Sequence, residues 1–197
     1  PNYEADDILG TLSKMFDKFI PTYILSKDCD ALQLVSHLTT LWLITKKAPR
    51  NNGMLNNILE LTPELVKQQF GLKPEQIVDK KALAGDPGDN IPGVAGIGEK
   101  TATTLLQQFG TLENIYQRLK NEKAFRQELK DLGIKRIPIK NLAKGMESAF
   151  LSKKLATIKT NITELKNTLI TDLLFKFHKE RAYDFLKNEL EIKTIML

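Results

Sequence analysis

The sequence is poor in the residues that build covalent cross-links and zinc sites. It has one cysteine, Cys29, and two histidines, His37 and His178, in 197 residues. A single cysteine forms no internal disulfide, and these three residues are too scattered to supply the clustered ligands of a zinc site. We therefore expect a protein of a reducing compartment, the cytoplasm.

Long hydrophobic runs are also absent. Apolar stretches such as residues 40–45 fall well short of the roughly 20 residues that a membrane-spanning helix requires, and no segment resembles a cleavable signal peptide. We expect no membrane contact. The 42% hydrophobic content is enough for a folded core, and the net charge of +5 permits a polyanionic partner without identifying one.

The first part of the chain has the pattern of an α/β domain. Apolar residues recur at helical spacing over residues 5–19, whereas residues 23–25 and 41–45 have the pattern of buried strands. Residues 31–38 between them look helical, so the order of strand, helix and strand predicts a parallel sheet. The turn residues in 46–57 predict an exposed loop.

From Thr62 onward the sequence predicts helices. Thr62 is expected to cap a helix that begins with Pro63 and ends at Gly71, and Pro74 is expected to begin the next helix. We place the boundary between an α/β part, residues 1–75, and a mainly helical lobe, residues 76–197, near residue 75. The last residues are expected to pack back on the core.

Three acidic groups lie at the ends of predicted elements. They are Glu4, Asp6 and Asp7 at the first helix, Asp28 and Asp30 after the first strand, and Asp86 and Asp89 in a loop. Several carboxylates that converge from different segments can hold hard cations such as Mg²⁺ or Mn²⁺. Each group alone favours a structural explanation, because acids stabilise helix starts and tight turns. Their combination with the next motif favours a metal site.

A glycine hairpin follows the last acidic group, in residues 91–102. Gly96 and Gly98 predict a tight turn that opens into a helix, with Lys100 and Thr101 in its first turn. Exposed amides at a helix start, an ammonium group and a hydroxyl can together bind a phosphodiester without reading its sequence. The nucleotide-binding patterns GxxxxGK[ST] and GxGxxG are absent, and a hairpin that only packs two helices is the structural alternative.

Four segments in this order resemble the 5′ to 3′ exonuclease domain of bacterial DNA polymerase I and the related flap endonucleases. The segments are residues 4–12, 25–35, 85–102 and 151–158. The resemblance implies a partial PIN-like sheet, a helical lobe with a helix-hairpin-helix, and a bacterial cytoplasmic nuclease that cuts 5′-flap, nicked or branched DNA. It also implies two-metal phosphodiester hydrolysis with two Mg²⁺ or Mn²⁺ ions.

The resemblance also assigns roles to the residues of these motifs. The implied catalytic metal ligands are Glu4, Asp6, Asp28, Asp30 and Asp89, with Asp7 and Asp86 as nearby acids of the metal site. The implied DNA-binding residues are Gly96, Gly98, Lys100 and Thr101, with a monovalent cation as a further ligand of the hairpin.

The chain also departs from the family pattern. Family members begin with a further half that supplies the first sheet strand, more acidic ligands and a basic helical arch, whereas this chain starts at Pro1, three residues before the acidic motif. We therefore expect a fragment that cleaves DNA weakly or not at all. Lys27 and Cys29 stand where the family more often has a small residue and a lysine, and residues 48–57 match poorly.

Other functions stay open at this point. A non-catalytic DNA-binding module would use the hairpin while the acids serve as caps and turns. A ribonuclease of the PIN type would share the sheet and the acids, but such proteins generally lack a long helical lobe with a glycine hairpin. A pure interaction protein is the third alternative, although no sequence feature indicates a protein partner.

Overall fold

The computed structural model describes residues 3–46, 57–134, 137–174, 178–189 and 191. Residues 1–162 form one compact unit and residues 163–197 a second one. Within the described ranges, no helix is long and apolar enough to cross a membrane.

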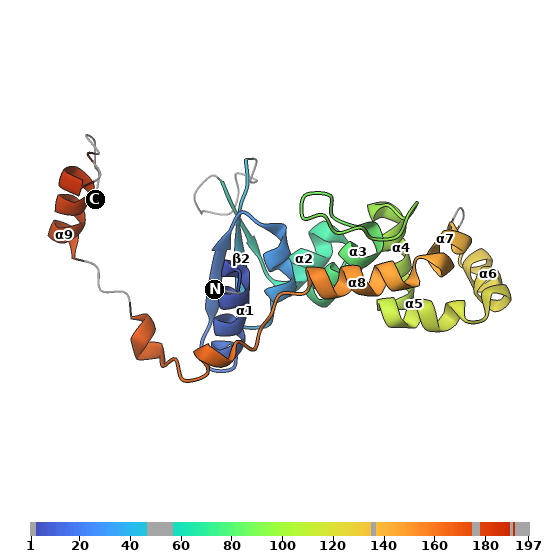
Figure 1. Ribbon diagram of the computed structural model, residues 1–197, viewed down its shortest axis with the longest axis horizontal. Coiled ribbons are helices and arrows are strands. Elements are labelled where there is room, and N and C mark those ends of the chain that lie inside the picture. Colours follow the sequence, from blue (N-terminus) through green and yellow to red (C-terminus); the bar gives the residue numbers. More distant parts are fainter. Residues whose placement is uncertain (1–2, 47–56, 135–136, 175–177, 190, 192–197) are drawn as a thin grey trace. The chain divides into compact units, whose positions relative to one another are not determined.

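The first unit contains a small sheet and most of the helices (Figure 1). The strands are β1 (Thr22–Ser26), β2 (Thr39–Ile44) and β3 (Ile58–Leu61). The α-helices are α1 (Ala5–Phe16), α2 (Pro63–Phe70), α3 (Ile77–Ala84), α4 (Glu99–Phe109), α5 (Leu112–Leu119), α6 (Glu122–Asp131), α7 (Ile139–Lys144) and α8 (Met146–Ala156). Two 3-10 helices accompany them, η1 (Cys29–Leu34) and η2 (Pro74–Gln76).

The second unit is made of short helical segments. They are the 3-10 helices η3 (Thr163–Leu165) and η4 (Ile170–Leu173), the helix α9 (Lys179–Asp184) and the π-helical turn η5 (Phe185–Glu189). None of the predicted site residues lies in this unit.

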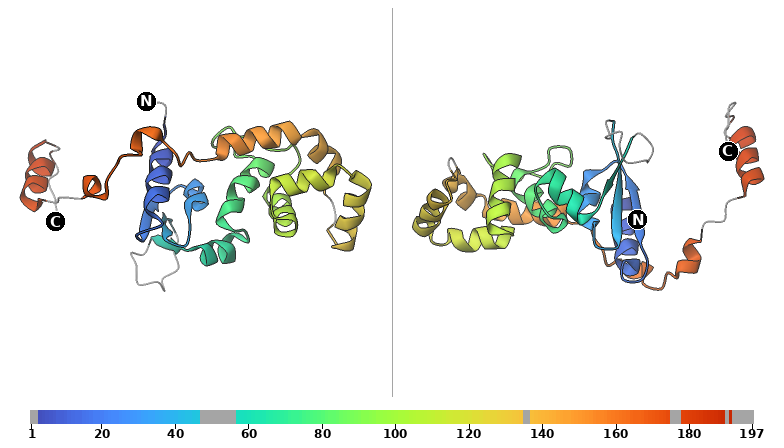
Figure 2. Two further views of the ribbon diagram at one scale, coloured as in Figure 1. Left: turned by 90° about the horizontal axis from the view of Figure 1, so that it is seen from below. Right: turned by 180° about the vertical axis from the view of Figure 1, so that it is seen from behind.

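The sheet has the strand order β1-β2-β3 (Figure 2). β1 and β2 are parallel, with Ile24 opposite Leu41, and this confirms the predicted parallel pair. β3 pairs antiparallel to β2, with Leu59 opposite Leu43, so the sheet is mixed. The prediction missed β3 because this strand has only four residues and directly follows the polar stretch assigned to a loop.

Three local predictions need correction. Tyr23 and Leu25 were predicted to be buried, but they are 55% and 57% exposed, and only Ile24 of that trio is in the core. The helix predicted for residues 31–38 is the shorter η1, which begins earlier because the Asp28 side chain caps it. α1 ends at Phe16 rather than residue 19. The predicted loop falls mostly on residues 47–56, outside the described residues.

The predicted helix boundaries after the sheet are confirmed. The Thr62 hydroxyl accepts a hydrogen bond from the backbone N–H of Leu65, Pro63 is the first residue of α2, and Gly71 ends that helix. Pro74 begins η2, which leads directly into α3.

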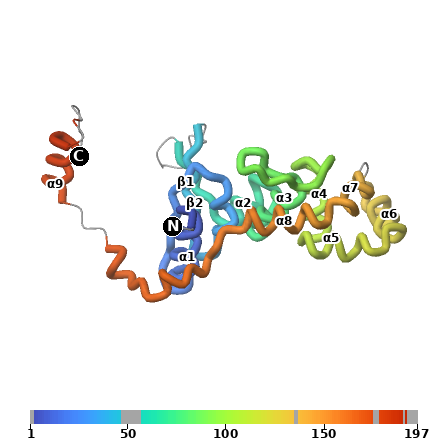
Figure 3. Tube along the Cα trace, viewed as in Figure 1, coloured from blue at the N-terminus to red at the C-terminus, as the bar shows by residue number. Residues whose placement is uncertain are grey.

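One continuous cluster of buried apolar side chains runs from the sheet into the helices. It includes Leu41 of β2, Leu83 of α3, Leu105 of α4 and Phe125 of α6. α8 packs along α3, as the tube in Figure 3 shows. The sheet, which carries one set of acids, and the helices, which carry the hairpin, therefore share a core.

A buried carboxylate fixes α3, α5 and α8 to one another. Asp79 of α3 is 3% exposed and accepts a hydrogen bond of 2.9 Å from the backbone N–H of Leu112, at the start of α5. Its second oxygen lies 2.7 Å from the Lys153 ammonium of α8, which also contacts Glu113 at 2.8 Å. Removal of Lys153 would leave a buried charge unpaired, so this contact specifies how the three helices meet.

The chain segments before and after the turn that carries Asp86 and Asp89 lie close together. Asp86 and Ile91 exchange two backbone hydrogen bonds of 2.9 Å each. Beyond them, Gly93 has a φ of +61°, and a Cβ atom at this position would lie 2.2 Å from the backbone nitrogen of Gly85. Only a residue without a side chain allows this approach.

We expect Gly93→Ala to lower the free energy of unfolding by about 2 kcal/mol or more, because the added carbon meets rigid backbone at a strained φ. Gly98→Ala is the matched control. A Cβ atom there meets nothing within 4 Å, and we expect a change of about 0.5 kcal/mol. Urea unfolding of both variants measures the difference, and equal losses would contradict the proposed steric cause.

Candidate functional site

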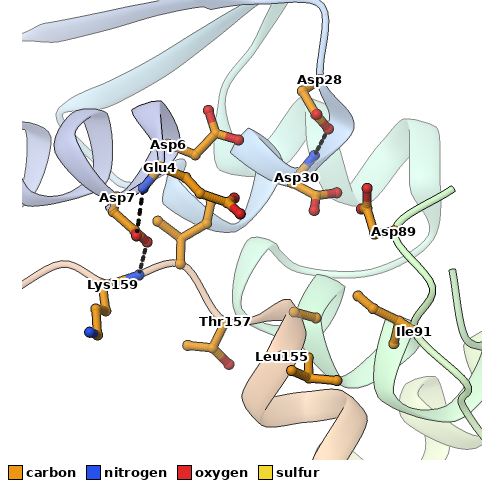
Figure 4. A pocket seen from close by; sticks show the side chains of 12 residues that line it. Glu4, Asp6, Asp7, Asp28, Asp30, Asp89, Ile91, Leu155, Thr157 and Lys159 are labelled. Atoms are coloured by element: carbon orange, nitrogen blue, oxygen red, sulfur yellow. Dashed lines mark hydrogen bonds between the residues drawn. The ribbon is translucent and has the colours of Figure 1, made fainter. Parts of the chain in front are cut away.

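Acidic side chains from three segments of the chain line one cavity of about 510 Å³ (Figure 4). The acids that line it are Glu4, Asp6, Asp7, Asp28, Asp30 and Asp89. The rest of the wall consists of Ile91 and residues 155–159. Six of the seven acids that the sequence singled out therefore meet in one place, although they come from α1, η1 and the turn after α3.

Local hydrogen bonds orient the acids that follow β1. The backbone N–H of Asp28 donates to the Ser26 hydroxyl at 3.0 Å, and an oxygen of Asp28 accepts from the backbone N–H of Asp30 at 2.9 Å. The second of these bonds is drawn in Figure 4. It turns the chain into η1 immediately after the strand, which places the carboxylates of both residues at the cavity.

Asp86, the seventh acid, belongs to a tighter group beside the cavity. Carboxylate oxygens of Asp30, Asp86 and Asp89 all lie within 4.8 Å of one another. Lys81 of α3 contacts all three carboxylates, at 2.6 Å to Asp86, at 3.5 Å to Asp89 and with a direct contact to Asp30. Sequence reasoning missed Lys81 because a lysine in the last turn of a helix is expected on electrostatic grounds alone.

The pKa values of these groups reflect burial and the Lys81 ammonium. Burial raises the pKa of Asp6, and the neighbouring Asp28 carboxylate adds to this rise. Burial also raises the pKa of Asp30 in spite of its contact with Lys81. The hydrogen bond from Lys81 lowers the pKa of Asp86. Burial acts to lower the pKa of Lys81, but the hydrogen bonds and charges of Asp30 and Asp86 outweigh it and raise that pKa.

The residues fit a divalent cation of the hard type. The donor set consists of carboxylate oxygens, which Mg²⁺ and Mn²⁺ prefer. The Lys81 ammonium lies among three of these carboxylates, which shows that their arrangement accommodates positive charge at this point. A bound ion would replace that ammonium as the counter-charge of the group.

Asp7 has a different environment from the other acids. One of its oxygens accepts a hydrogen bond from the backbone N–H of Glu4 at 3.2 Å, and the other accepts from the backbone N–H of Lys159 at 2.8 Å. Both bonds hold backbone in place. Asp7 therefore fixes the start of α1 to the opposite wall of the cavity.

That wall continues into a segment that we call the strap, residues 157–162. The Gln33 amide donates to the carbonyl of Ala156 and accepts from the N–H of Ile158, both at 3.0 Å. The Thr11 hydroxyl lies 3.3 Å from the carbonyl of Lys159 and from the N–H of Ile162. Side chains of α1 and η1 thus anchor the strap along its length, a role that no spacing in the sequence had indicated.

The structure places the predicted DNA-binding residues at the start of α4. Gly98 precedes the helix, Lys100 and Thr101 lie in its first turn, and Gly96 lies in the hairpin before it. None of the four lines the acidic cavity. Lys100 is exposed, so its ammonium is available to a ligand from solvent.

α8 holds the hairpin in place through two serines that sequence reasoning did not select. The Ser148 hydroxyl donates to the carbonyl of Gly93 at 2.6 Å, and the Ser152 hydroxyl accepts from the N–H of Gly93 at 2.9 Å. Asn141 donates to the carbonyl of Ala95 at 3.0 Å. Because the strap follows α8 directly, one stretch of chain contacts both the hairpin and the acidic cavity.

Two family models match consecutive parts of the chain. Residues 1–71 match the N-terminal resolvase-like domain of 5′-3′ exonucleases, and residues 72–173 match their C-terminal SAM fold. Together they cover every predicted site residue.

Curated relatives include much longer proteins. DNA polymerase I of Lactococcus lactis subsp. cremoris is 39% identical over 96% of this chain, and DNA polymerase I of Bacillus caldotenax is 45% identical over 80% of it. The matched regions make up 21% and 16% of those proteins, so the chain spans about a fifth of their length or less.

Solved structures share the fold. The 5′-exonuclease of bacteriophage T5 with bound zinc ions aligns with a TM-score of 0.60 at 23% identity, over 96% of this chain and 60% of its own. A bacteriophage T5 flap endonuclease in a pseudo-enzyme–product complex with DNA and metal ions aligns with a TM-score of 0.60 at 21% identity, over 96% and 59%.

Lys81→Met should lower the free energy of unfolding by about 1–3 kcal/mol in the absence of divalent ions, because three carboxylates then face one another without a counter-charge. Mg²⁺ should restore more stability to this variant than it adds to the unmodified chain, because the ion no longer competes with an ammonium. Thermal unfolding with and without Mg²⁺ measures both effects. Lys80→Met on the same helix is the control, and an equal Mg²⁺ effect in all three proteins would contradict the competition.

Proposed function

The chain belongs to the 5′-3′ exonuclease family, and from that membership we propose that it forms part of a metal-dependent nuclease that cuts 5′-flap, nicked or branched DNA. The observation that carries the proposal is the convergence of six carboxylates on one cavity, with a seventh next to them, in a chain whose glycine hairpin is held by α8. The bacterial cytoplasm is the proposed location, which rests on the bacterial relatives and the single cysteine.

We assign the carboxylates to metal binding according to their surroundings. Glu4, Asp6, Asp28, Asp30 and Asp89 are the proposed catalytic ligands of two Mg²⁺ or Mn²⁺ ions. Asp86 and Asp7 complete the proposed metal site, Asp86 through its proximity to Asp30 and Asp89 and Asp7 through the backbone that it fixes. Bound ions would activate water and offset the charge that develops on the phosphate.

The acids of the chain contribute chiefly by position. Their carboxylates come from rigid elements with hydrogen-bonded backbone, so little reorganisation is required when ions and substrate arrive. Lys81 offsets part of the charge of three carboxylates until ions take its place. Hydrolysis by this arrangement requires no side-chain nucleophile.

The hairpin is the proposed binding site for the DNA backbone. Gly96 and Gly98 allow the DNA backbone to approach, and the amides at the start of α4, the Lys100 ammonium and the Thr101 hydroxyl are the proposed phosphate contacts. A monovalent cation at the hairpin belongs to the proposal on the family resemblance alone.

A non-catalytic DNA-binding module is the second candidate function. Lys81 favours it, because an internal ammonium satisfies Asp30, Asp86 and Asp89 without any metal. Titration with Mn²⁺ separates the two functions, because the module predicts no ion binding that depends on these carboxylates.

The direct test is cleavage of a labelled 5′-flap duplex with Mn²⁺. We expect little cleavage by this chain alone, and recovery when the amino-terminal half that family members carry is added. In the recovered system, the double variant Asp28→Asn, Asp30→Asn should lose activity by about 100-fold or more, because two carboxylates leave the site. Cleavage by the chain alone that this variant abolishes would refute our expectation of an incomplete site. Failure of recovery would favour the binding module.

A separate measurement tests the hairpin. Lys100→Gln should weaken duplex binding about eightfold at 0.1 M salt, since one phosphate contact contributes about 0.9 to the slope of log affinity against log salt concentration. Lys120→Gln, a change of another exposed lysine directly after α5, is the control. Fluorescence anisotropy with labelled duplex provides the readout. If both variants bind like the unmodified chain, the proposed DNA binding by the hairpin is refuted.

A further inference from the structure

We propose that Lys159 contacts a phosphate of the DNA backbone at the rim of the acidic cavity, as a positioning residue for the strand that enters the site. The inference rests on the proposed function, because it concerns how the same cavity receives its substrate. It adds a contact on the strap, away from the hairpin at the start of α4.

The backbone of Lys159 is held on both sides. Its N–H donates to Asp7 at 2.8 Å, and its carbonyl accepts from the Thr11 hydroxyl at 3.3 Å. Gln33 fixes the chain just before it through two further hydrogen bonds. A lysine on an anchored backbone loses less conformational freedom on binding than one on a loose loop, so its contact is stronger.

The Lys159 side chain is exposed, so its charge can act on a ligand. Lys159 is the one basic residue among the cavity-lining residues that the structure describes, and its ammonium lies 5.1 Å from the centre of the Tyr3 ring. Within the described part of the chain it forms no ion pair with a carboxylate, in contrast to Lys81, which contacts three. In Figure 4 its side chain points away from the labelled carboxylates.

A cation at this place reduces the electrostatic repulsion between the site and DNA. Clustered carboxylates repel the phosphates of an approaching strand, and this repulsion is strongest before divalent ions are bound. A rim ammonium offers an opposite charge where the strand arrives, and it does not compete with metal ions for the carboxylates. Lys81 does not supply this contact because its side chain is only 12% exposed and is not part of the cavity wall.

Thr157, the other exposed polar residue of this wall, does not fit the same role. Its hydroxyl donates its hydrogen to the carbonyl of Lys153 at 2.6 Å. The oxygen that remains can only accept hydrogen bonds, and a phosphodiester offers only acceptors. The contact therefore falls to Lys159 alone.

The hairpin and Lys159 are close enough for one DNA duplex to contact both. Ser152 contacts Gly93 at the base of the hairpin, and the path from Ser152 to Lys159 comprises the last helical turn of α8 and the start of the strap. Helical and extended rises limit that path to about 16 Å. Successive phosphates of a strand advance about 3.4 Å along the duplex axis, so a few nucleotides span this distance.

The test is the salt dependence of DNA binding. Lys159→Gln keeps most of the aliphatic stem and removes the charge, and Lys154→Gln is the matched control, because Lys154 is also exposed but lies outside the cavity wall. Binding of a labelled 5′-flap duplex is followed by fluorescence anisotropy in Ca²⁺, between about 50 and 200 mM salt. Lys159→Arg tests rescue by a second cation.

We expect Lys159→Gln to reduce the salt slope by about 0.9 and to weaken binding about eightfold at 0.1 M salt. The control should keep the slope of the unmodified chain, and Lys159→Arg should restore it. An unchanged slope in Lys159→Gln, or the same loss in Lys154→Gln, overturns this inference, while binding that still depends on Lys100 leaves the proposed function standing. Absence of DNA binding by the unmodified chain overturns both.

Discussion

Repulsion between like charges is the constraint on which this site depends. Six carboxylates line one cavity and a seventh lies beside it, and each must be held there by something stronger than its tendency to separate from the others. The chain uses two devices. Lys81 places an ammonium among three of the acids, and backbone N–H groups donate to Asp7 and Asp28. The protein thus stabilises a concentration of negative charge that suits cations, and burial accounts for the raised pKa of Asp6 and Asp30.

The same constraint explains why the site is built from separate elements. Asp6 follows a helix start, Asp30 lies in a 3-10 helix after a strand, and Asp89 lies in a turn closed by two backbone hydrogen bonds. Each position gives its carboxylate a fixed backbone, and the shared core of sheet and helices keeps these backbones in place. A site on one flexible loop would relax by moving its charges apart. Here the packing of α3 against α8, secured by Asp79 and Lys153, resists that movement.

Much of this could be predicted from sequence because the relevant signals are local. Acids at helix starts, a proline after Thr62 and glycines before α4 all act on their own neighbourhood, and the structure confirms those elements. Contacts between distant segments carry no such signal. Lys81, Gln33 and Ser152 look like ordinary helix residues until the fold brings them to the acids, the strap and the hairpin. β3 escaped notice for a related reason, since a strand of four residues shows little alternation and is defined by its pairing with β2.

Because α8 continues directly into the strap, insertions and deletions in this stretch of the chain are restricted. Ser152 must face Gly93, and only a few residues later Ala156 and Ile158 must both face Gln33. One inserted or deleted codon between these points would rotate everything after it by about 100° around the helix axis, since a turn takes 3.6 residues. Either the hairpin or the cavity wall would lose its partner. Substitutions can accumulate on the exposed side of α8, but its length is tied to the spacing between a turn and a cluster of charges.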